Sequence, residues 1–195
     1  MSRARTLILH KPYRVLTSFT DPENQGRATV GDFVPVSGVY AAGRLDYDSE
    51  GLLLLTSDGK LAHRITHPRY KLPKVYLAQV ENIPDQRALA QLRRGVMVKG
   101  KTTRPAKVEL LPTEPDTFPR QPPIRYRKNV PTAWLKITLR EGRKRQVRRM
   151  TAAVGHPTLR LIRVAIGPLS LGSLAPGQWR DLTPVELKNL RENLR

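Results

Sequence analysis

Three acidic residues crowd one short segment of this chain, and glycines mark both ends of the segment. Asp46, Asp48 and Glu50 lie between Gly43 and Gly51, although the whole chain has a formal net charge of +19. A carboxylate can act as a nucleophile, transfer a proton, stabilise a developing positive charge or bind a metal. The cluster therefore makes this segment a candidate site in an otherwise basic protein.

Metal-centred chemistry fits the acidic segment poorly. Its first half matches a calcium-binding loop, but the twelfth position, which should carry a glutamate, is Ser57. A magnesium-dependent nuclease that uses Asp46 with Asp48 stays open, although alternate residues of a strand point to opposite faces and only a turn would bring them together. His63 and His67 are four residues apart but lack the third ligand of a zinc helix. We expect no metal site.

A second informative segment, residues 140–150, is strongly basic. Val147, Met150 and Val154 recur at helical spacing, so we expect a helix over residues 143–154 with one apolar stripe. Its first two turns would carry five cations, although a helix N-terminus already bears about +0.5 of a charge. Each misplaced cation costs about 0.3–1 kcal/mol, which favours a nearby anion over the alternative of a merely solvated basic face.

The overall composition identifies the partner class. With 35 Lys and Arg against 16 Asp and Glu, the chain should bind polyanions by neutralising phosphates and releasing their counterions, so nucleic acid is the expected partner and a membrane surface is the competing polyanion. No apolar run approaches the roughly 20 residues of a membrane-spanning helix, and we expect no membrane contact and a cytoplasmic location. The chain has no cysteine, which excludes disulfides and thiolate chemistry. Nothing suggests a heptad or an exposed apolar helix, and we expect a monomer.

The elements that must position these residues alternate along the chain as an α+β fold. Most strands alternate apolar with polar residues, as half-buried antiparallel strands do, and several expected helices have capping residues at their starts. The expected helices are 59–65, 85–94, 143–154 and 184–193. The expected strands are 6–10, 15–19, 39–42, 52–56, 75–80, 96–99, 107–111, 134–139 and 158–166. Strands 39–42 and 52–56 should hold Asp46 on a loop between them.

Residues 112–131 form an expected long loop. The segment contains six prolines, three arginines and a lysine, and proline is excluded from helix interiors and central strands. A surface excursion without a ligand is one reading. The other is an RNA-contacting arm that uses Arg120, Arg125, Arg127 and Lys128, with Tyr126 available to stack.

Four motifs, in this order and spacing, resemble the RsuA-like pseudouridine synthases. They are Gly43-Arg44-Leu45-Asp46, the strand 74–78, the basic segment 141–150 and the ending 161–169, so the likeness covers nearly the whole chain. The resemblance implies the pseudouridine synthase catalytic fold, a mixed and mostly antiparallel central sheet with flanking helices and an active-site cleft. It further implies one catalytic domain over residues 1–195, either undivided or as two closely joined lobes, and we expect no separate N-terminal RNA-binding domain.

The resemblance also implies a reaction and its residues. Asp46 would be the catalytic aspartate in the isomerisation of uridine to pseudouridine in ribosomal RNA. The expected substrate is the RNA of the large subunit. The target nucleotide would first be flipped out of its stack. Tyr76 would stack on the base, and Arg148 would pair with Asp46. No cofactor is implied. The implied RNA contacts are Arg44, Lys74, Arg143, Lys144, Arg145, Gln146 and Arg149.

One alternative class stays open at this stage, a non-catalytic RNA-binding protein such as a ribosome assembly factor. It explains the positive charge equally well. It does not explain Asp46, because a carboxylate that faces phosphates weakens RNA binding.

Overall fold

A computed structural model of the chain describes residues 4–70, 72–124 and 128–194. The chain divides into two compact units: unit 1 comprises Met1–Leu72 and Arg163–Arg195, and unit 2 comprises Pro73–Ile162. Strand β9 (Thr158–Ile166) therefore gives its first residues to unit 2 and its last residues to unit 1. The expectation of a single catalytic domain stays a prediction.

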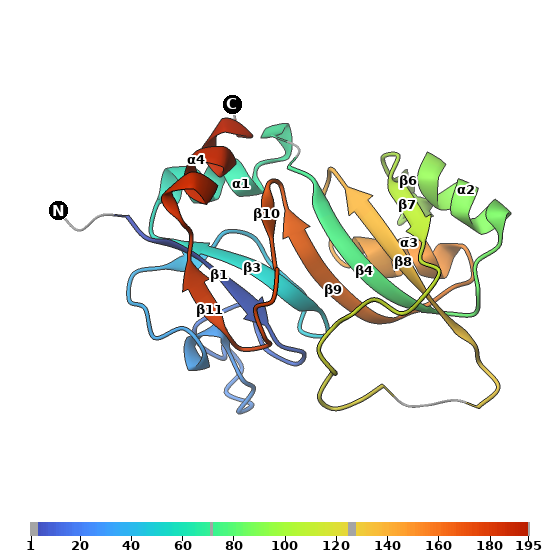
Figure 1. The fold of residues 1–195 in the computed structure, drawn as a ribbon, viewed down its shortest axis with the longest axis horizontal. Helices are drawn as coiled ribbons and strands as arrows, with labels where there is room; N and C mark the ends of the chain where they lie inside the picture. The colour runs from blue at the N-terminus through green and yellow to red at the C-terminus, as the bar shows by residue number, and fades with distance from the viewer. Residues whose placement is uncertain (1–3, 71, 125–127, 195) are drawn as a thin grey trace. The chain divides into compact units, whose positions relative to one another are not determined.

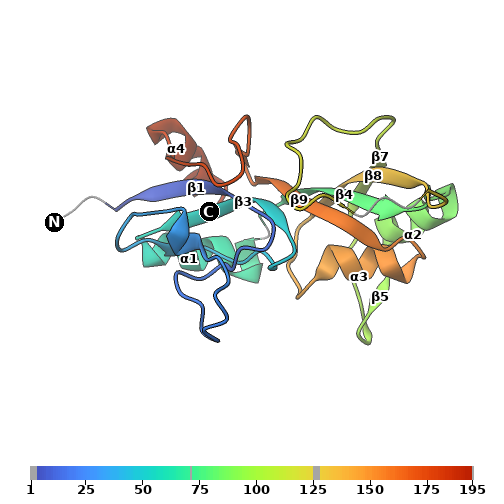
Figure 2. The same ribbon diagram turned by 90° about the horizontal axis from the view of Figure 1, so that it is seen from below.

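Unit 1 is built on strands that are buried on both faces. Its strand order is β11-β1-β3-β9, with β2 paired to β3 and β10 paired to β9. Every residue of β1 and β3 is buried, and Figure 2 shows α1 and α4 on opposite sides of these strands. The elements of unit 1 are β1 (Thr6–Lys11), η1 (Val30–Asp32), β2 (Tyr40–Ala41), β3 (Glu50–Thr56), α1 (Gly59–Thr66), η2 (Pro68–Tyr70), β10 (Leu169–Ser170), β11 (Trp179–Asp181) and α4 (Pro184–Glu192).

Unit 2 is an antiparallel sheet with helices packed on it (Figure 1). Its strand order is β9-β4-β8-β7, and strand β8 alternates buried with exposed or half-buried residues over much of its length. Buried residues of α2 and α3 join those of β4 and β8 in one apolar core. The elements are β4 (Lys74–Glu81), α2 (Gln86–Arg94), β5 (Met97–Val98), β6 (Lys101–Thr102), β7 (Lys107–Leu110), β8 (Thr132–Leu139) and α3 (Gln146–Ala153).

The expected α+β class with a mostly antiparallel sheet is confirmed, but several boundaries were wrong. Residues 15–19 form no strand, and only Leu16 makes an isolated bridge, to Thr29. The chain turns at Arg14, where φ is +58°. The Thr17 hydroxyl donates a hydrogen bond to the Leu45 carbonyl. The strand expected over 39–42 is reduced to β2, and β6, β10 and β11 were missed because strands of two or three residues have no periodicity to detect.

Residues 112–131 contain no helix or strand in the part that the structure describes, as expected. Arg120 donates hydrogen bonds to the carbonyls of Pro122 and Pro123. Arg125, Tyr126 and Arg127 of the expected RNA-contacting arm lie outside the described residues. The arm stays a prediction.

The N-terminus of α4 allows a direct test of the expected capping box. Thr183 Oγ1 accepts the Glu186 N–H at 3.2 Å, and the Glu186 carboxylate accepts the Thr183 N–H at 2.9 Å. We expect Thr183→Ala to lower the free energy of unfolding by about 1 kcal/mol. Thr183→Ser keeps the hydroxyl and should cost far less in urea unfolding. Equal losses for both variants would show that the cap does not hold the helix end.

Candidate active site

The loop that carries Asp46 is pinned to its own unit by a threonine. We call residues 43–49, between β2 and β3, the acid loop. Thr17 Oγ1 donates to the Leu45 carbonyl at 2.6 Å and accepts the Leu45 N–H at 3.3 Å. Leu45 is itself buried in the apolar core of unit 1, and the Asp46 carbonyl accepts the Ser49 N–H at 3.0 Å, which closes a turn. Asp46 is half-buried at this turn.

A fully buried lysine lies close to the acid loop. Lys11 is 0% exposed, and its Nζ donates to the carbonyls of Pro12 and Val15, each at 2.8 Å. Burial lowers the Lys11 pKa to about 7, against the opposing effect of nearby carboxylates, of which Glu50 is the strongest. Sequence analysis missed Lys11, although a charged residue at the end of the apolar run 6–10 was a usable signal.

The low pKa of Lys11 makes stability depend on pH. Between the folded pKa of about 7 and the ordinary value of 10.5, the unfolded chain binds more protons than the folded chain. The free energy of unfolding should therefore rise with pH in this window, by at most about 1.4 kcal/mol per pH unit. Below the folded pKa Lys11 is protonated in both states, so burial of its charge lowers the free energy of unfolding by its full amount and this contribution no longer changes with pH.

The Lys11→Met variant isolates this contribution, because other groups titrate alike in both proteins. We expect the wild-type free energy of unfolding, minus that of the variant, to become more positive between pH 7 and pH 10.5. Urea unfolding at several pH values measures the difference. A difference that stays constant across the window would contradict the low pKa.

Arg163 is a second buried cation that sequence analysis missed. It is 3% exposed. Its Nε donates to the Leu52 carbonyl at 2.8 Å, and its Nη1 donates to the Arg44 carbonyl at 3.3 Å. Arg44 itself is exposed, as an RNA contact requires. An arginine inside the apolar run 161–166 was the signal that could have singled out Arg163.

The basic segment of unit 2 is organised around one carboxylate. Glu141 accepts the Arg104 N–H at 2.9 Å and the Gln146 side-chain amide at 2.5 Å, and it pairs with Arg143 at 3.4 Å. The Arg143 guanidinium also donates to both carbonyls of β6. Gln146 is 5% exposed, so both residues support the local fold, and their contacts with RNA stay predictions.

Helix α3 begins three residues later than expected. Arg145 precedes it with a left-handed φ of +55°, so three of the five cations expected in the first two turns lie before the helix and not within it. Val147 and Met150 are buried and Val154 is half-buried, which confirms the apolar stripe. Lys144 is exposed and Arg149 is half-buried.

The two other residues with expected catalytic roles lie in unit 2. Tyr76 is half-buried on β4, opposite Ile137 of β8, and packs against the unit 2 core. Lys74 is half-buried at the start of the same strand. Arg148 is half-buried on α3, and its Nη1 donates to the Thr158 carbonyl at 3.0 Å. Asp46 belongs to unit 1, so its pairing with Arg148, and the expected cleft, stay predictions.

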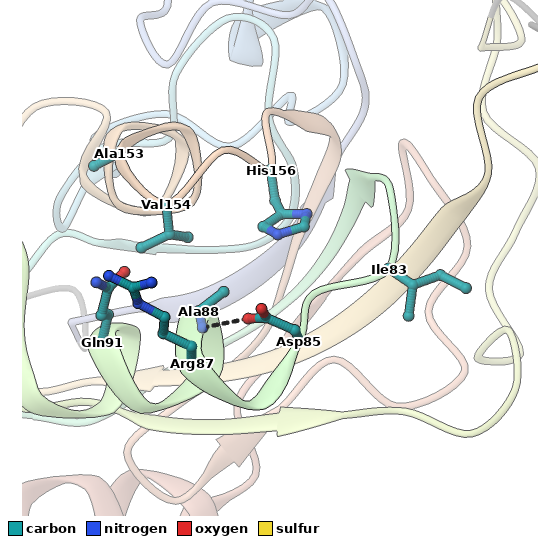
Figure 3. A pocket seen from close by; sticks show the side chains of 8 residues that line it. All are labelled: Ile83, Asp85, Arg87, Ala88, Gln91, Ala153, Val154 and His156. Carbon is teal, nitrogen blue, oxygen red and sulfur yellow. Dashed lines mark hydrogen bonds between the residues drawn. The ribbon is translucent and has the colours of Figure 1, made fainter.

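A cavity of about 410 Å³ opens in unit 2 at the start of α2 (Figure 3). Asp85 caps that helix by accepting the Ala88 N–H at 2.7 Å. His156, beyond the end of α3, lies opposite it. None of the residues with expected catalytic or RNA-binding roles lines this cavity.

Metal-binding clusters and membrane-spanning helices are both absent from the part of the chain that the structure describes. No group of three or more histidines, cysteines, aspartates or glutamates among the described residues is arranged to hold a metal ion. None of the helices that these residues form has the length and apolar character needed to cross a membrane.

The fold and the sequence correspond to a known class of RNA-modifying enzymes. Residues 5–153 match the family model described as RNA pseudouridylate synthase, and the chain belongs to this family. The expected identity as an enzyme, an isomerase, is thereby confirmed.

Individual relatives extend the match to nearly the whole chain. The ribosomal large subunit pseudouridine synthase E of Xanthomonas campestris is 58% identical over 174 residues, which cover 89% of this chain and 93% of that protein. The ribosomal large subunit pseudouridine synthase B of Bacillus subtilis is 40% identical over 187 residues, 94% of this chain and 70% of that protein. A crystal structure of a pseudouridylate synthase superposes with a TM-score of 0.80 at 31% identity, covering 97% of this chain and 75% of the other.

Proposed function

We propose that this chain converts uridine to pseudouridine in ribosomal RNA, and in the RNA of the large subunit in particular. The observation that carries the proposal is the 58% identity to a relative named as a large-subunit enzyme. The formal net charge of +19 supports a structured polyanion as substrate, because phosphate neutralisation provides most of the affinity for RNA. We propose that the enzyme acts as a monomer in the cytoplasm.

The reaction suits a carboxylate on a fixed loop. The bond between uracil N1 and ribose C1′ breaks, the base turns, and a bond forms from C5 to C1′, after which the C5 proton is lost and N1 gains one. The reaction is an isomerisation with no net oxidation or reduction, so its balance needs no redox cofactor. Asp46 would act as the nucleophile or stabilise the positive charge at the sugar. The acid loop supports this role, because Thr17 and the turn at Ser49 fix the backbone on either side of Asp46.

Other residues would prepare the substrate. A stacked uridine does not expose its glycosidic bond, so the nucleotide must be flipped out. Tyr76 would stack on the flipped base, and Arg148 would keep Asp46 ionised. Arg44, Lys74, Lys144 and Arg149 would contact the RNA backbone, which positions the substrate without reading its sequence.

Release of tritium from ribosomal RNA labelled at uracil C5 tests the proposal. We expect release from large-subunit RNA in the presence of a chelator, with the RNA intact, and little release from small-subunit RNA. Release from small-subunit RNA alone would overturn the substrate assignment. RNA cleavage that the chelator stops would instead support the magnesium-dependent nuclease.

A further inference from the structure

Burial of the Arg163 side chain lowers the stability of unit 1. It lies in β9 between apolar neighbours and is 3% exposed. Its Nη2 is buried, and among the described residues it has no hydrogen-bond partner. A buried charge without full hydrogen bonding lowers stability, and an apolar side chain of similar volume would often stabilise the fold more. This cost suggests a task other than packing.

The two carbonyls that Arg163 binds lie on either side of Asp46. The Arg44 carbonyl is in the acid loop before Asp46, and the Leu52 carbonyl follows the loop in β3. One planar guanidinium thus ties both ends of the segment that carries the carboxylate. Lysine cannot reproduce this arrangement, because its ammonium is a single point and lacks the fixed fork of donors.

Arg163 also keeps its positive charge at neutral pH, in contrast to the nearby Lys11. The pKa of Lys11 falls to about 7, so that lysine loses much of its charge near neutral pH. A guanidinium stays charged throughout the working range. The carboxylates of the acid loop and of Glu50 lie close enough to Lys11 to raise its pKa, and the positive charge of Arg163 lies close enough to lower it.

We propose that Arg163 is a positioning residue, which holds the acid loop so that the Asp46 carboxylate meets the target nucleotide in its reactive geometry. The inference rests on the proposed function and adds a residue that acts through Asp46 without touching RNA. Its removal should therefore change the rate of the chemical step and leave RNA affinity unaltered.

Arg160 offers a matched control on the same strand. It is 6% exposed, and its Nη2 donates to the Phe118 carbonyl at 2.7 Å, in a loop of unit 2. We expect Arg163→Lys to lower the single-turnover rate about 100-fold, since small misplacements of a catalytic group have effects of this size. The RNA dissociation constant should stay within about twofold. Arg160→Lys should keep the wild-type rate. Equal rates for the two variants, or a rate loss that follows thermal unfolding, would overturn the proposal.

Hydrogen exchange separates this inference from the proposed function, because it requires no substrate. Amides of residues 43–49 should exchange faster in Arg163→Lys than in wild type, and Arg160→Lys should leave them unchanged. Unchanged exchange in Arg163→Lys would refute the positioning role even if the protein proved to modify another RNA. Absence of tritium release from wild type would refute only the proposed function.

Chemical rescue supplies a second variant. Arg163→Ala leaves a space for a guanidinium ion, and low-millimolar guanidinium should restore activity where methylammonium does not. Equal effects of the two cations, or no effect of either, would show that the forked donor is not what the loop requires.

Discussion

Asp46→Asn is expected to abolish pseudouridine formation while RNA binding persists. The amide has nearly the shape of the carboxylate, and the turn at the acid loop uses the Asp46 backbone carbonyl, which the variant keeps. The charge is lost, and with it the nucleophile or the stabilisation of the sugar cation. We expect the single-turnover rate to fall at least about 1,000-fold, equivalent to about 4 kcal/mol of transition-state stabilisation.

Asp48→Asn is the control for this experiment, because it removes one carboxylate from the same loop. We expect its rate to stay within about tenfold of wild type. RNA affinity of Asp46→Asn should equal or slightly exceed that of wild type, since a negative charge facing phosphates is removed. A fully active Asp46→Asn enzyme, or a greater loss in Asp48→Asn, would mean that the wrong carboxylate has been assigned.

Gly51→Ala is expected to have the largest effect on stability. Gly51 has a φ of +106°, and a Cβ there would overlap the Arg163 carbonyl oxygen and approach the Arg163 nitrogen to 2.7 Å. Both neighbours are backbone atoms of an interior strand, so neither can move cheaply. Overpacking costs about 1–3 kcal/mol and a strained backbone about 1–3 kcal/mol more. Together these approach the whole stability of a typical domain, about 5–15 kcal/mol.

Urea unfolding measures this loss, and Gly59→Ala provides the comparison. Gly59 begins α1, and a Cβ there meets no atom within 4 Å. Alanine should be neutral or stabilising at that position, by up to about 1 kcal/mol. A Gly51→Ala protein as stable as Gly59→Ala would show that β3 and β9 are not so closely packed at Gly51.

Elements with strong local signals could be predicted from the sequence. The apolar run 52–55 predicted β3, and capping residues marked the starts of α1 and α4, where Asp58 and Thr183 accept backbone N–H groups. The strand predicted over residues 15–19 was wrong, because tertiary contacts outweighed the local alternation of apolar and polar residues. The predicted start of α3 was wrong, because nothing in the sequence indicates that Arg145 adopts a left-handed backbone conformation, which is rare for residues other than glycine.

The candidate site was predictable only where a motif marked it. Asp46 stands out because carboxylates are rare in so basic a chain, and the resemblance of its segment to a family motif predicts a catalytic role, which stays a prediction. Lys11 and Arg163 were missed because a cation in or beside an apolar run is only a weak signal until its burial is known. The bonds of Arg163 to Leu52 and Arg44 join residues more than 100 positions apart, so local sequence patterns do not indicate them.

The division of the chain has a consequence for protein synthesis. Unit 1 takes strands from both ends of the described sequence, because β1 pairs with β3 early in the chain and with β11 near its end. Unit 2 is continuous, so it can fold as soon as residue 162 has left the ribosome. The acid loop emerges long before Arg163, and a nascent chain therefore exposes Asp46 without the side chain that ties its loop. Competence for RNA modification would arrive only with about the last sixth of the polypeptide, after translation has nearly finished.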